Sequence, residues 1–159
     1  MRVRTGVEGF DPIVGGGLPE GASVVLQGPA GNEKDLFGLQ FLAEGLRSGE
    51  ALLIVVSSQS PEQYLESLAK LDVNVKEAIA GNRVRVVDWH AYRDGNVAGV
   101  EERDHIIRAS VDLTNVGIAL SRALGTLVPG VPRRAVLEVL SPALQVFEVG
   151  QVYAFAQSS

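Results

Sequence analysis

Cysteine is absent from this sequence of 159 residues, so neither disulfide bonds nor thiolate metal sites contribute to its stability or chemistry. Histidine is scarce, and with only His90 and His105 a zinc site is not expected. No segment approaches the ~20 consecutive apolar residues that a helix needs to cross a bilayer, and the N-terminus lacks the apolar core of a signal peptide. These absences predict a cytoplasmic protein that does not enter a membrane.

Positive charge is also in short supply. The chain has 14 Lys and Arg against 19 Asp and Glu, which gives a net charge of −5. A chain of this sign has no general attraction for the phosphate backbone of nucleic acids, although a local basic groove would still allow contact. A nucleic-acid partner is therefore not expected.

The residues that are present indicate a compact protein. Hydrophobic residues make up 46% of the chain and charged residues 21%, which is typical of a globular domain with a real core. Apolar runs alternate with amphipathic segments, and there is no internal repeat or linker-like stretch. Residues 1–159 are predicted to form a single α/β domain.

The predicted elements follow from apolar periodicity. Runs rich in Val, Leu and Ile predict strands at Ala22–Gln27, Ala51–Val56, Arg83–Asp88 and Arg134–Leu140. Apolar residues at helical spacing predict helices between Glu33 and Gly49, after the N-cap candidate Ser60, and over about Val111–Leu124.

Two segments carry weaker patterns. The polar stretch Trp89–Arg103 contains two glycines and predicts a long loop, with the indole of Trp89 buried at the edge of the sheet. The last segment starts with Ser141 and Pro142, as helices often do, but its β-branched and aromatic residues also allow a strand around Gly150–Ala156.

The stretch GPAGNEKD lies between the first predicted strand and the first predicted helix. In that position, backbone amides and a helix N-terminus can surround phosphate groups. By itself, such a loop is also typical of an ordinary strand-to-helix turn. The candidate cofactor-binding residues are Gly28, Gly31, Asn32, Glu33, Lys34 and Asp35.

The residues around this loop carry a more specific pattern. The lead-in TGVEGFDPIVGGGLPEG, Thr5 to Gly21, resembles the "TG-x-x-G-x-D-x-x-x-GGG-x-P-x-G" opening of the KaiC-like branch of RecA-type ATPases. SSQSPEQ resembles the family's segment after its second strand, usually E-E-S-P-E-Q, and RAVLEVLS resembles the strand with its magnesium-associated aspartate. The resemblance covers nearly the whole chain. It implies a three-layer RecA-like P-loop fold with a mostly parallel central sheet, here C-terminally shortened.

The loop departs from the family pattern at two residues. Glu33 replaces the glycine before Lys34, and Asp35 replaces the Ser or Thr that binds magnesium. Two like charges ~4 Å apart repel by roughly 4 kcal/mol at an effective dielectric constant near 20, so both acids disfavour a triphosphate. We expect them to satisfy the positive end of the helix themselves, which stabilises a helix start by ~0.3–1 kcal/mol. Two roles remain open for Lys34. It forms an ion pair with Glu33, Asp35 or Glu138, or it contacts phosphate.

Two further departures concern the reaction. Ser58 and Gln59 stand where the family has the paired glutamates that activate water, and neither is a useful base near neutral pH. Glu138 stands at the position of the magnesium-associated aspartate. These changes lead us to assign no catalytic residue and no metal ligand.

The expected function is therefore a catalytically inactive KaiC-like domain that serves as an interaction or regulatory module, for example in signalling. It needs no cofactor and has a protein partner or associates with itself. One alternative is an atypical ATPase that binds ATP and Mg²⁺ and takes catalytic groups from a partner subunit. A second alternative is an accessory protein in nucleic-acid recombination.

The resemblance also raises a question about the sheet. In RecA-type folds a further strand lies between the phosphate-loop strand and the strand with the magnesium-associated acid, and the chain ends before such a strand is encoded. It is then either a domain excerpt or a naturally shortened protein. Ala22–Gln27 pairs directly with Arg134–Leu140, or the last segment, a second copy or another chain fills the gap.

Overall fold

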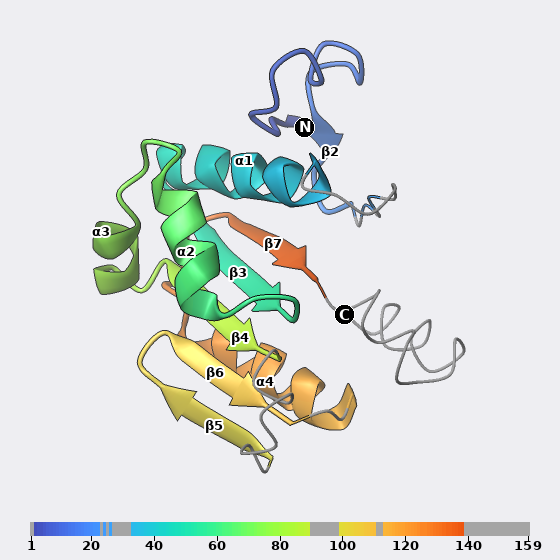
Figure 1. Ribbon diagram of the computed structural model, residues 1–159. Helices are drawn as coiled ribbons and strands as arrows, with labels where there is room; N and C mark the ends of the chain where they lie inside the picture. Colours follow the sequence, from blue (N-terminus) through green and yellow to red (C-terminus); the bar gives the residue numbers. More distant parts are fainter. Residues whose placement is uncertain are drawn as a thin grey trace.

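The computed structural model describes residues 2–22, 24, 26, 33–89, 99–110 and 113–138. This part of the chain has an α/β architecture (Figure 1). In chain order its elements are β1 (Arg2–Val3), β2 (Leu18–Pro19), α1 (Glu33–Arg47), β3 (Ala51–Val56), α2 (Pro61–Ala69), α3 (Val75–Ala80), β4 (Val84–Asp88), β5 (Val100–Arg103), β6 (Ile106–Ala109), α4 (Leu113–Thr126) and β7 (Arg133–Leu137).

The central sheet has the strand order β5-β6-β4-β3-β7 within the described residues. β3 pairs in parallel with β4 and β7, and β4 pairs in parallel with β6. β5 forms an antiparallel hairpin with β6. This mostly parallel sheet confirms the predicted fold class.

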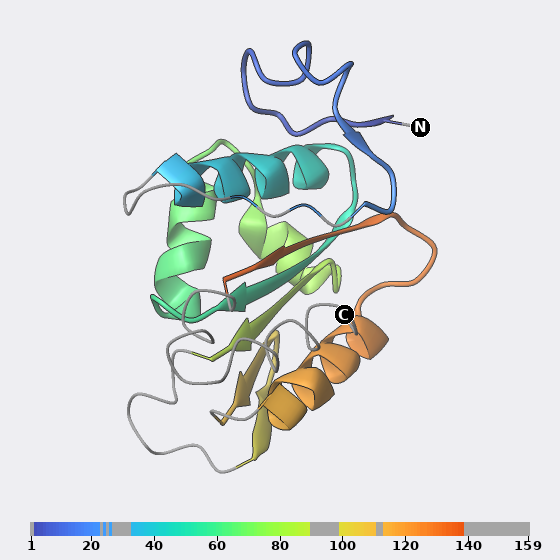
Figure 2. The same cartoon turned by 90° about the vertical axis from the view of Figure 1, so that its right-hand side faces the viewer.

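Helices cover both faces of the sheet, which gives three layers. α1, α2 and α3 lie on one face, where Leu42 and Tyr64 pack against Ile54 of β3. α4 lies on the other face, where its Val116 packs in the same cluster as Ile107 of β6 (Figure 2). Because both faces are covered, the six consecutive residues of β3 are all buried, as expected for a central parallel strand.

The start of α2 confirms the predicted cap. The hydroxyl of Ser60 accepts a hydrogen bond from the backbone N–H of Gln63 at 3.2 Å, and the side chain of Gln63 accepts one from the backbone N–H of Ser60 at 3.3 Å. Pro61 occupies the first helical position. These features fix the turn that follows the carboxyl end of β3.

The strand predicted at Ala22–Gln27 is wrong for the residues that the structure describes. Ala22, Val24 and Leu26 are not in a strand, and the exposed fractions of Val24 and Leu26 are 56% and 47%. The remaining residues of that segment lie outside the described part. An apolar run becomes a strand only when a neighbouring strand pairs with it, and the expected direct pairing with β7 is not seen for these residues.

The loop predicted over Trp89–Arg103 is wrong at its C-terminal end. Val100–Arg103 forms β5, which pairs with β6 across a turn where Asp104 has a positive φ of 54°. Charged residues fill β5, so its strand character depends on pairing rather than on apolar alternation. Trp89 is buried as predicted, with 1% exposed, whereas residues 90–98 lie outside the described part.

The strand predicted at Arg134–Leu140 is confirmed as β7, which spans Arg133–Leu137. Residues 139–159, including the helix or strand predicted after Ser141, lie outside the described residues. In the part that the structure describes, no helix is long and apolar enough to cross a bilayer.

Candidate functional site

Hydrogen bonds explain the spacing of Thr5 and Asp11 in the lead-in. Asp11 accepts hydrogen bonds from the Thr5 hydroxyl at 2.7 Å and from the backbone N–H groups of Thr5 at 3.1 Å and Gly6 at 3.4 Å. Burial acts to raise the pKa of Asp11, but these hydrogen bonds outweigh it and lower the pKa below its ordinary value. The carboxylate thus folds the lead-in into a closed turn.

The glycines of the lead-in permit backbone conformations that other residues disfavour. Gly17 has a φ of +132°, and a Cβ there would lie 2.3 Å from the carbonyl oxygen of Val3. Only glycine permits this close approach between β1 and the segment entering β2. The lead-in is thereby folded into a compact unit beside α1 (Figure 1).

Arg134 ties this lead-in to the sheet. Its guanidinium lies 2.5 Å from a carboxylate oxygen of Glu50 and donates hydrogen bonds to the carbonyl oxygens of Arg4 at 2.7 Å and Phe41 at 3.0 Å. It also lies 4.6 Å from the centroid of the Phe41 ring. Charged residues at a strand end are usually solvated, but only 6% of Arg134 is exposed. It reaches inward because residue 134 faces α1.

The helix start predicted at the phosphate loop is confirmed. α1 begins at Glu33, which places Glu33, Lys34 and Asp35 in its first turn. Asp35 is exposed. Gly28, Gly31 and Asn32 lie outside the described residues, as do the side chains of Glu33 and Lys34. The structure therefore places the helix start but not the loop before it.

Glu138 follows β7 at the carboxyl end of the sheet. Its backbone N–H donates to the carbonyl oxygen of Val55 in β3 at 3.0 Å. The Ser58 hydroxyl donates to its carboxylate at 3.1 Å, and the Ser57 hydroxyl donates to its backbone carbonyl. The two serines after β3 are thus bound to Glu138, and the structure brings together two of the positions that the sequence singled out.

Negative charge accumulates at this point. Burial raises the pKa of Glu138, the hydrogen bond from Ser58 partly opposes that rise, and the negative charge of Asp35 adds to it. Burial also raises the pKa of Tyr64 in α2, with further contributions from the charges of Glu138 and Asp35. The start of α1, α2 and β7 meet here, because a Cβ built on Gly38 of α1 would lie 3.6 Å from the Tyr64 hydroxyl and 3.3 Å from the Val136 side chain. We call Asp35, Ser58, Tyr64 and Glu138 the acidic site.

The topology explains why these residues meet. From β3 the chain proceeds to β4 on one side, whereas β7 is added later on the other side of β3. In open α/β sheets, ligands bind outside the carboxyl ends of the strands at such a switch point. The acidic site lies there, beside the start of α1.

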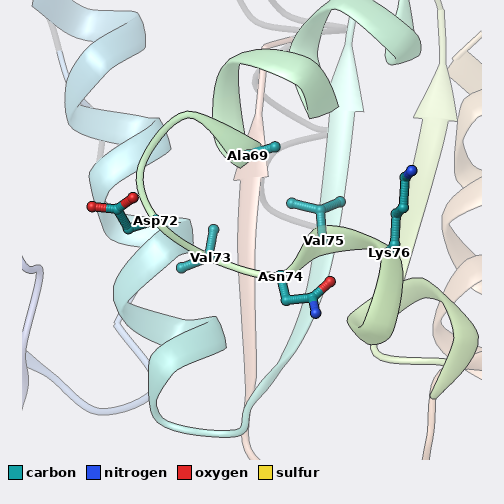
Figure 3. Close-up of a pocket in the computed structure, with 6 residues that line it drawn as sticks. All are labelled: Ala69, Asp72, Val73, Asn74, Val75 and Lys76. Atoms are coloured by element: carbon teal, nitrogen blue, oxygen red, sulfur yellow. The ribbon is translucent and has the colours of Figure 1, made fainter.

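A hollow of about 500 Å³ lies elsewhere, at the turn between α2 and α3. Figure 3 shows its six lining residues, among which the charged side chains of Asp72 and Lys76 point in different directions. The hollow is open and lined mainly by the connecting backbone. It gathers no set of groups suited to chemistry, so the acidic site remains the candidate functional site.

Sequence reasoning missed Tyr64 and the role of Arg134. In the sequence, Tyr64 looks like any other residue on the apolar face of α2. Only the fold buries its phenol and exposes it to the charges of Glu138 and Asp35, which raise its pKa. The position of Arg134 inside an apolar strand pattern could have indicated that its side chain is buried. Its partner Glu50 is 84 residues away in the sequence, so the ion pair could not be predicted.

Comparison with known proteins shows which family the sequence resembles. The family model described as "ATPase: KaiC" matches residues 3–126. The circadian clock oscillator protein KaiC of Prochlorococcus marinus is 35% identical over 101 residues, which are 62% of this chain and 20% of that protein. A UPF0273 protein of Thermotoga maritima is 30% identical over 123 residues, 77% of this chain and 50% of that protein. The chain thus spans half or less of these relatives.

A solved structure supports the fold. The crystal structure of a KaiC-like protein of Pyrococcus horikoshii matches with a TM-score of 0.66 at 21% identity, over 99% of this chain and 62% of that one. At this level of identity the match bears on the fold alone. It confirms the KaiC-like RecA fold that the lead-in motif predicts.

Proposed function

Because the chain belongs to the KaiC ATPase family, we propose that it is a member that does not hydrolyse ATP and acts as an interaction or regulatory module in the cytoplasm. The observation that carries the proposal is the acidic site. Asp35 lies in the first turn of α1, which packs against β7, and Glu138 follows β7 with the Ser58 hydroxyl bound to its carboxylate at 3.1 Å; burial first, and the charge of Asp35 after it, raise the pKa of Glu138.

These residues do not fit a magnesium-bound triphosphate. Asp35 stands where the family has a neutral hydroxyl, so it adds a negative charge beside the phosphates, in addition to the acid that the family already has at the position of Glu138. Glu33 adds a third acid in the first turn of α1. The acids instead complement the partial positive charge at the helix start, as proposed from the sequence.

The groups needed for hydrolysis are also missing from their expected place. Ser58 and Gln59 stand in place of the paired glutamates, and the Ser58 hydroxyl is hydrogen-bonded to Glu138. A neutral hydroxyl is a poor base near pH 7. This supports a non-enzymatic role, and the clock function in the name of the Prochlorococcus relative supports signalling as the setting.

Binding of ATP tests the proposal. In equilibrium dialysis with excess Mg²⁺, we expect no binding tighter than ~100 μM, and phosphate release no faster than from the Lys34→Ala variant. The double variant Glu33→Gly, Asp35→Thr restores the family pattern and is expected to bind ATP at least tenfold more tightly than the native chain. Tight ATP binding by the native chain would refute the proposal.

The family match also supports a second candidate, an atypical ATPase, because the matched residues 3–126 include the loop and Lys34. In that case ATP and Mg²⁺ bind at the loop, and a partner subunit supplies the missing acids. Phosphate release by the native chain above the Lys34→Ala control would favour this candidate.

A further inference from the structure

Residues 2–22, which comprise β1, the lead-in and β2, form a unit of their own, and we call this unit the strap. Among the described strands, β1 and β2 pair only with each other. The strap lies against α1 and projects away from the central sheet (Figures 1 and 2). Thr5 and Gly17 are the only buried residues within it. Because a single pair of strands with so little buried surface is not stable alone, the strap depends on α1 to stay folded.

The strap follows one stripe of α1. The ring of Phe10 meets the ring of Phe37 edge to face, with 5.2 Å between their centroids. Gly6 lies so close to the helix that a Cβ on it would be 3.2 Å from the carbonyl oxygen of Gln40 and 2.8 Å from the Cβ of Glu44. Residues three and four positions apart share one face of a helix. The strap therefore covers a continuous stripe, separate from the leucines that α1 packs against the sheet.

Two polar contacts also hold the strap. Arg4 pairs with Glu44 at 2.5 Å, and Arg134 donates to the carbonyl oxygen of Arg4 at 2.7 Å. When the strap leaves, Glu44 keeps Arg47 at 3.7 Å and Arg134 keeps Glu50 at 2.5 Å. The side chain of Arg4 is 73% exposed, so its ion pair contributes little. The strap can thus detach without leaving an unpaired charge on the rest of the protein.

Within the strap, hydrogen bonds converge on Asp11. Its carboxylate accepts from the backbone N–H groups of Thr5 and Gly6, and its backbone carbonyl accepts from the N–H of Gly16 at 2.7 Å. Gly6 takes part both in this cluster and in the contact with α1. Loss of the contact with α1 therefore also weakens the internal bonds, which favours opening as one cooperative unit.

We propose that the strap opens from α1 as one unit while the central sheet stays folded, and that it thereby covers and uncovers the stripe of Phe37, Gln40 and Glu44. None of residues 2–22 belongs to the two buried clusters on the faces of the sheet. Opening therefore leaves the core intact and costs less free energy than global unfolding. No nucleotide takes part in this opening, so its test is independent of ATP binding.

Hydrogen exchange tests the proposal on the full chain labelled with ¹⁵N, without nucleotide. The amides of Thr5 and Gly16 report on the strap, and those of Leu52 and Val86, which donate to neighbouring strands, report on the sheet. Thr5 and Gly16 are expected to share one opening equilibrium, populated at least about tenfold more than that of the sheet. Equal opening of strap and sheet would overturn the proposal. So would exchange of both strap amides at the rate of an unfolded chain, because no closed state would then exist.

Gly6→Ala and Gly9→Ala are a matched pair of variants. Both glycines have a left-handed φ, +75° and +80°, so alanine strains the backbone similarly at either position. The Cβ at residue 6 would meet α1, whereas the Cβ at residue 9 meets nothing within 4 Å. Relative to Gly9→Ala, Gly6→Ala is expected to increase the opening of Thr5 and Gly16 by one common factor, roughly tenfold, and that of Leu52 by less than about twofold. Equal opening in the two variants would show that α1 does not hold the strap, and different factors at Thr5 and Gly16 would show that it does not open as a unit.

A second pair of variants avoids backbone strain. Phe10→Ala removes the ring that contacts Phe37, whereas Ile13→Ala removes a large side chain of the same strap that is 81% exposed. Phe10→Ala is expected to increase the opening of Thr5 and Gly16 about fivefold, and Ile13→Ala by less than about twofold. The same increase in both variants would overturn the proposal, because contact with α1 would then not keep the strap closed.

Discussion

The two outer strands of the described sheet, β5 and β7, differ in how they meet solvent. Three of the four residues of β5, Glu101, Glu102 and Arg103, are charged and exposed. β7 instead leaves Ala135 and Leu137 exposed on one face. Charged side chains on an outer strand disfavour pairing with another chain. β5 is therefore built as an end of the sheet, whereas β7 has the features of an inner strand whose neighbour is absent from the described residues.

The two strands also differ in how they are held. β5 depends on its hairpin with β6 and on contacts with α4. β7 is anchored by Arg134, which connects the strand to Glu50, to α1 and to the lead-in. Strong anchoring on the α1 side holds β7 in place, although no strand among the described residues pairs with its outer edge.

The largest expected effect comes from removing that anchor. Arg134→Met leaves the carboxylate of Glu50, which has 13% of its side chain exposed, without its cation, and it also removes two hydrogen bonds. Breaking a buried pair in this way destabilises proteins by about 3–5 kcal/mol, which urea unfolding measures. The control Arg4→Met should lose much less, because Arg4 is mostly exposed and Glu44 keeps Arg47 at 3.7 Å. Equal losses of stability in the two variants would show that the buried contacts of Arg134 contribute no more than the exposed ion pair of Arg4.

The second prediction concerns the lead-in, which covers the α1 side near β7 and has no counterpart at β5. Gly17→Ala introduces a Cβ 2.3 Å from the Val3 carbonyl at a φ of +132°, so the lead-in must rearrange. We expect a loss of about 1–3 kcal/mol from the backbone strain. Gly16→Ala also has a positive φ, but its Cβ meets nothing within 4 Å, so its loss should be smaller. Thermal unfolding of both variants measures the difference.

Local patterns predicted most of the fold. The continuous apolar run of β3, the cap at Ser60 and the helical spacing in α1 each specify an element without reference to distant residues. Ala22–Gln27 and Val100–Arg103 were mispredicted in opposite directions for one reason. Strand formation depends on a partner: Val100–Arg103 has one in β6, and the described residues of Ala22–Gln27 have none.

The candidate site was predictable in position but not in detail. The lead-in and the strand ends pointed to Glu138, Ser58 and Asp35 because each lies at a fixed place in a known pattern. Tyr64 and the hydrogen bonds from the serines to Glu138 depend on how α2 packs over the ends of β3 and β7. Such contacts between distant segments leave no local trace in the sequence.

The third prediction concerns how the free energy of unfolding depends on pH through Glu138, which follows β7. The raised pKa of Glu138 means that the folded chain holds this proton more tightly than the unfolded chain does. Stability therefore falls as pH rises from the ordinary Glu pKa, about 4.3, through the raised value. Glu138→Gln stays neutral, so its free energy of unfolding should exceed that of the native chain increasingly across this window. Urea unfolding of the native chain and of Glu138→Gln at several pH values measures this difference.

The smallest effect on stability, and the most direct test of the contrast between the edges, comes from one exposed leucine. Leu137 on β7 and Leu124 on α4 are 40% and 39% exposed, so replacing either by Lys should change the free energy of unfolding by only about 0.5 kcal/mol or less. Their effects on self-association should differ. A lysine on an open sheet edge blocks pairing between chains, so Leu137→Lys should raise the protein concentration at which light scattering appears during mild heating. Leu124→Lys adds the same charge away from any sheet edge and should raise it less. Equal effects of the two variants would mean that net charge, and not the open edge of β7, governs association.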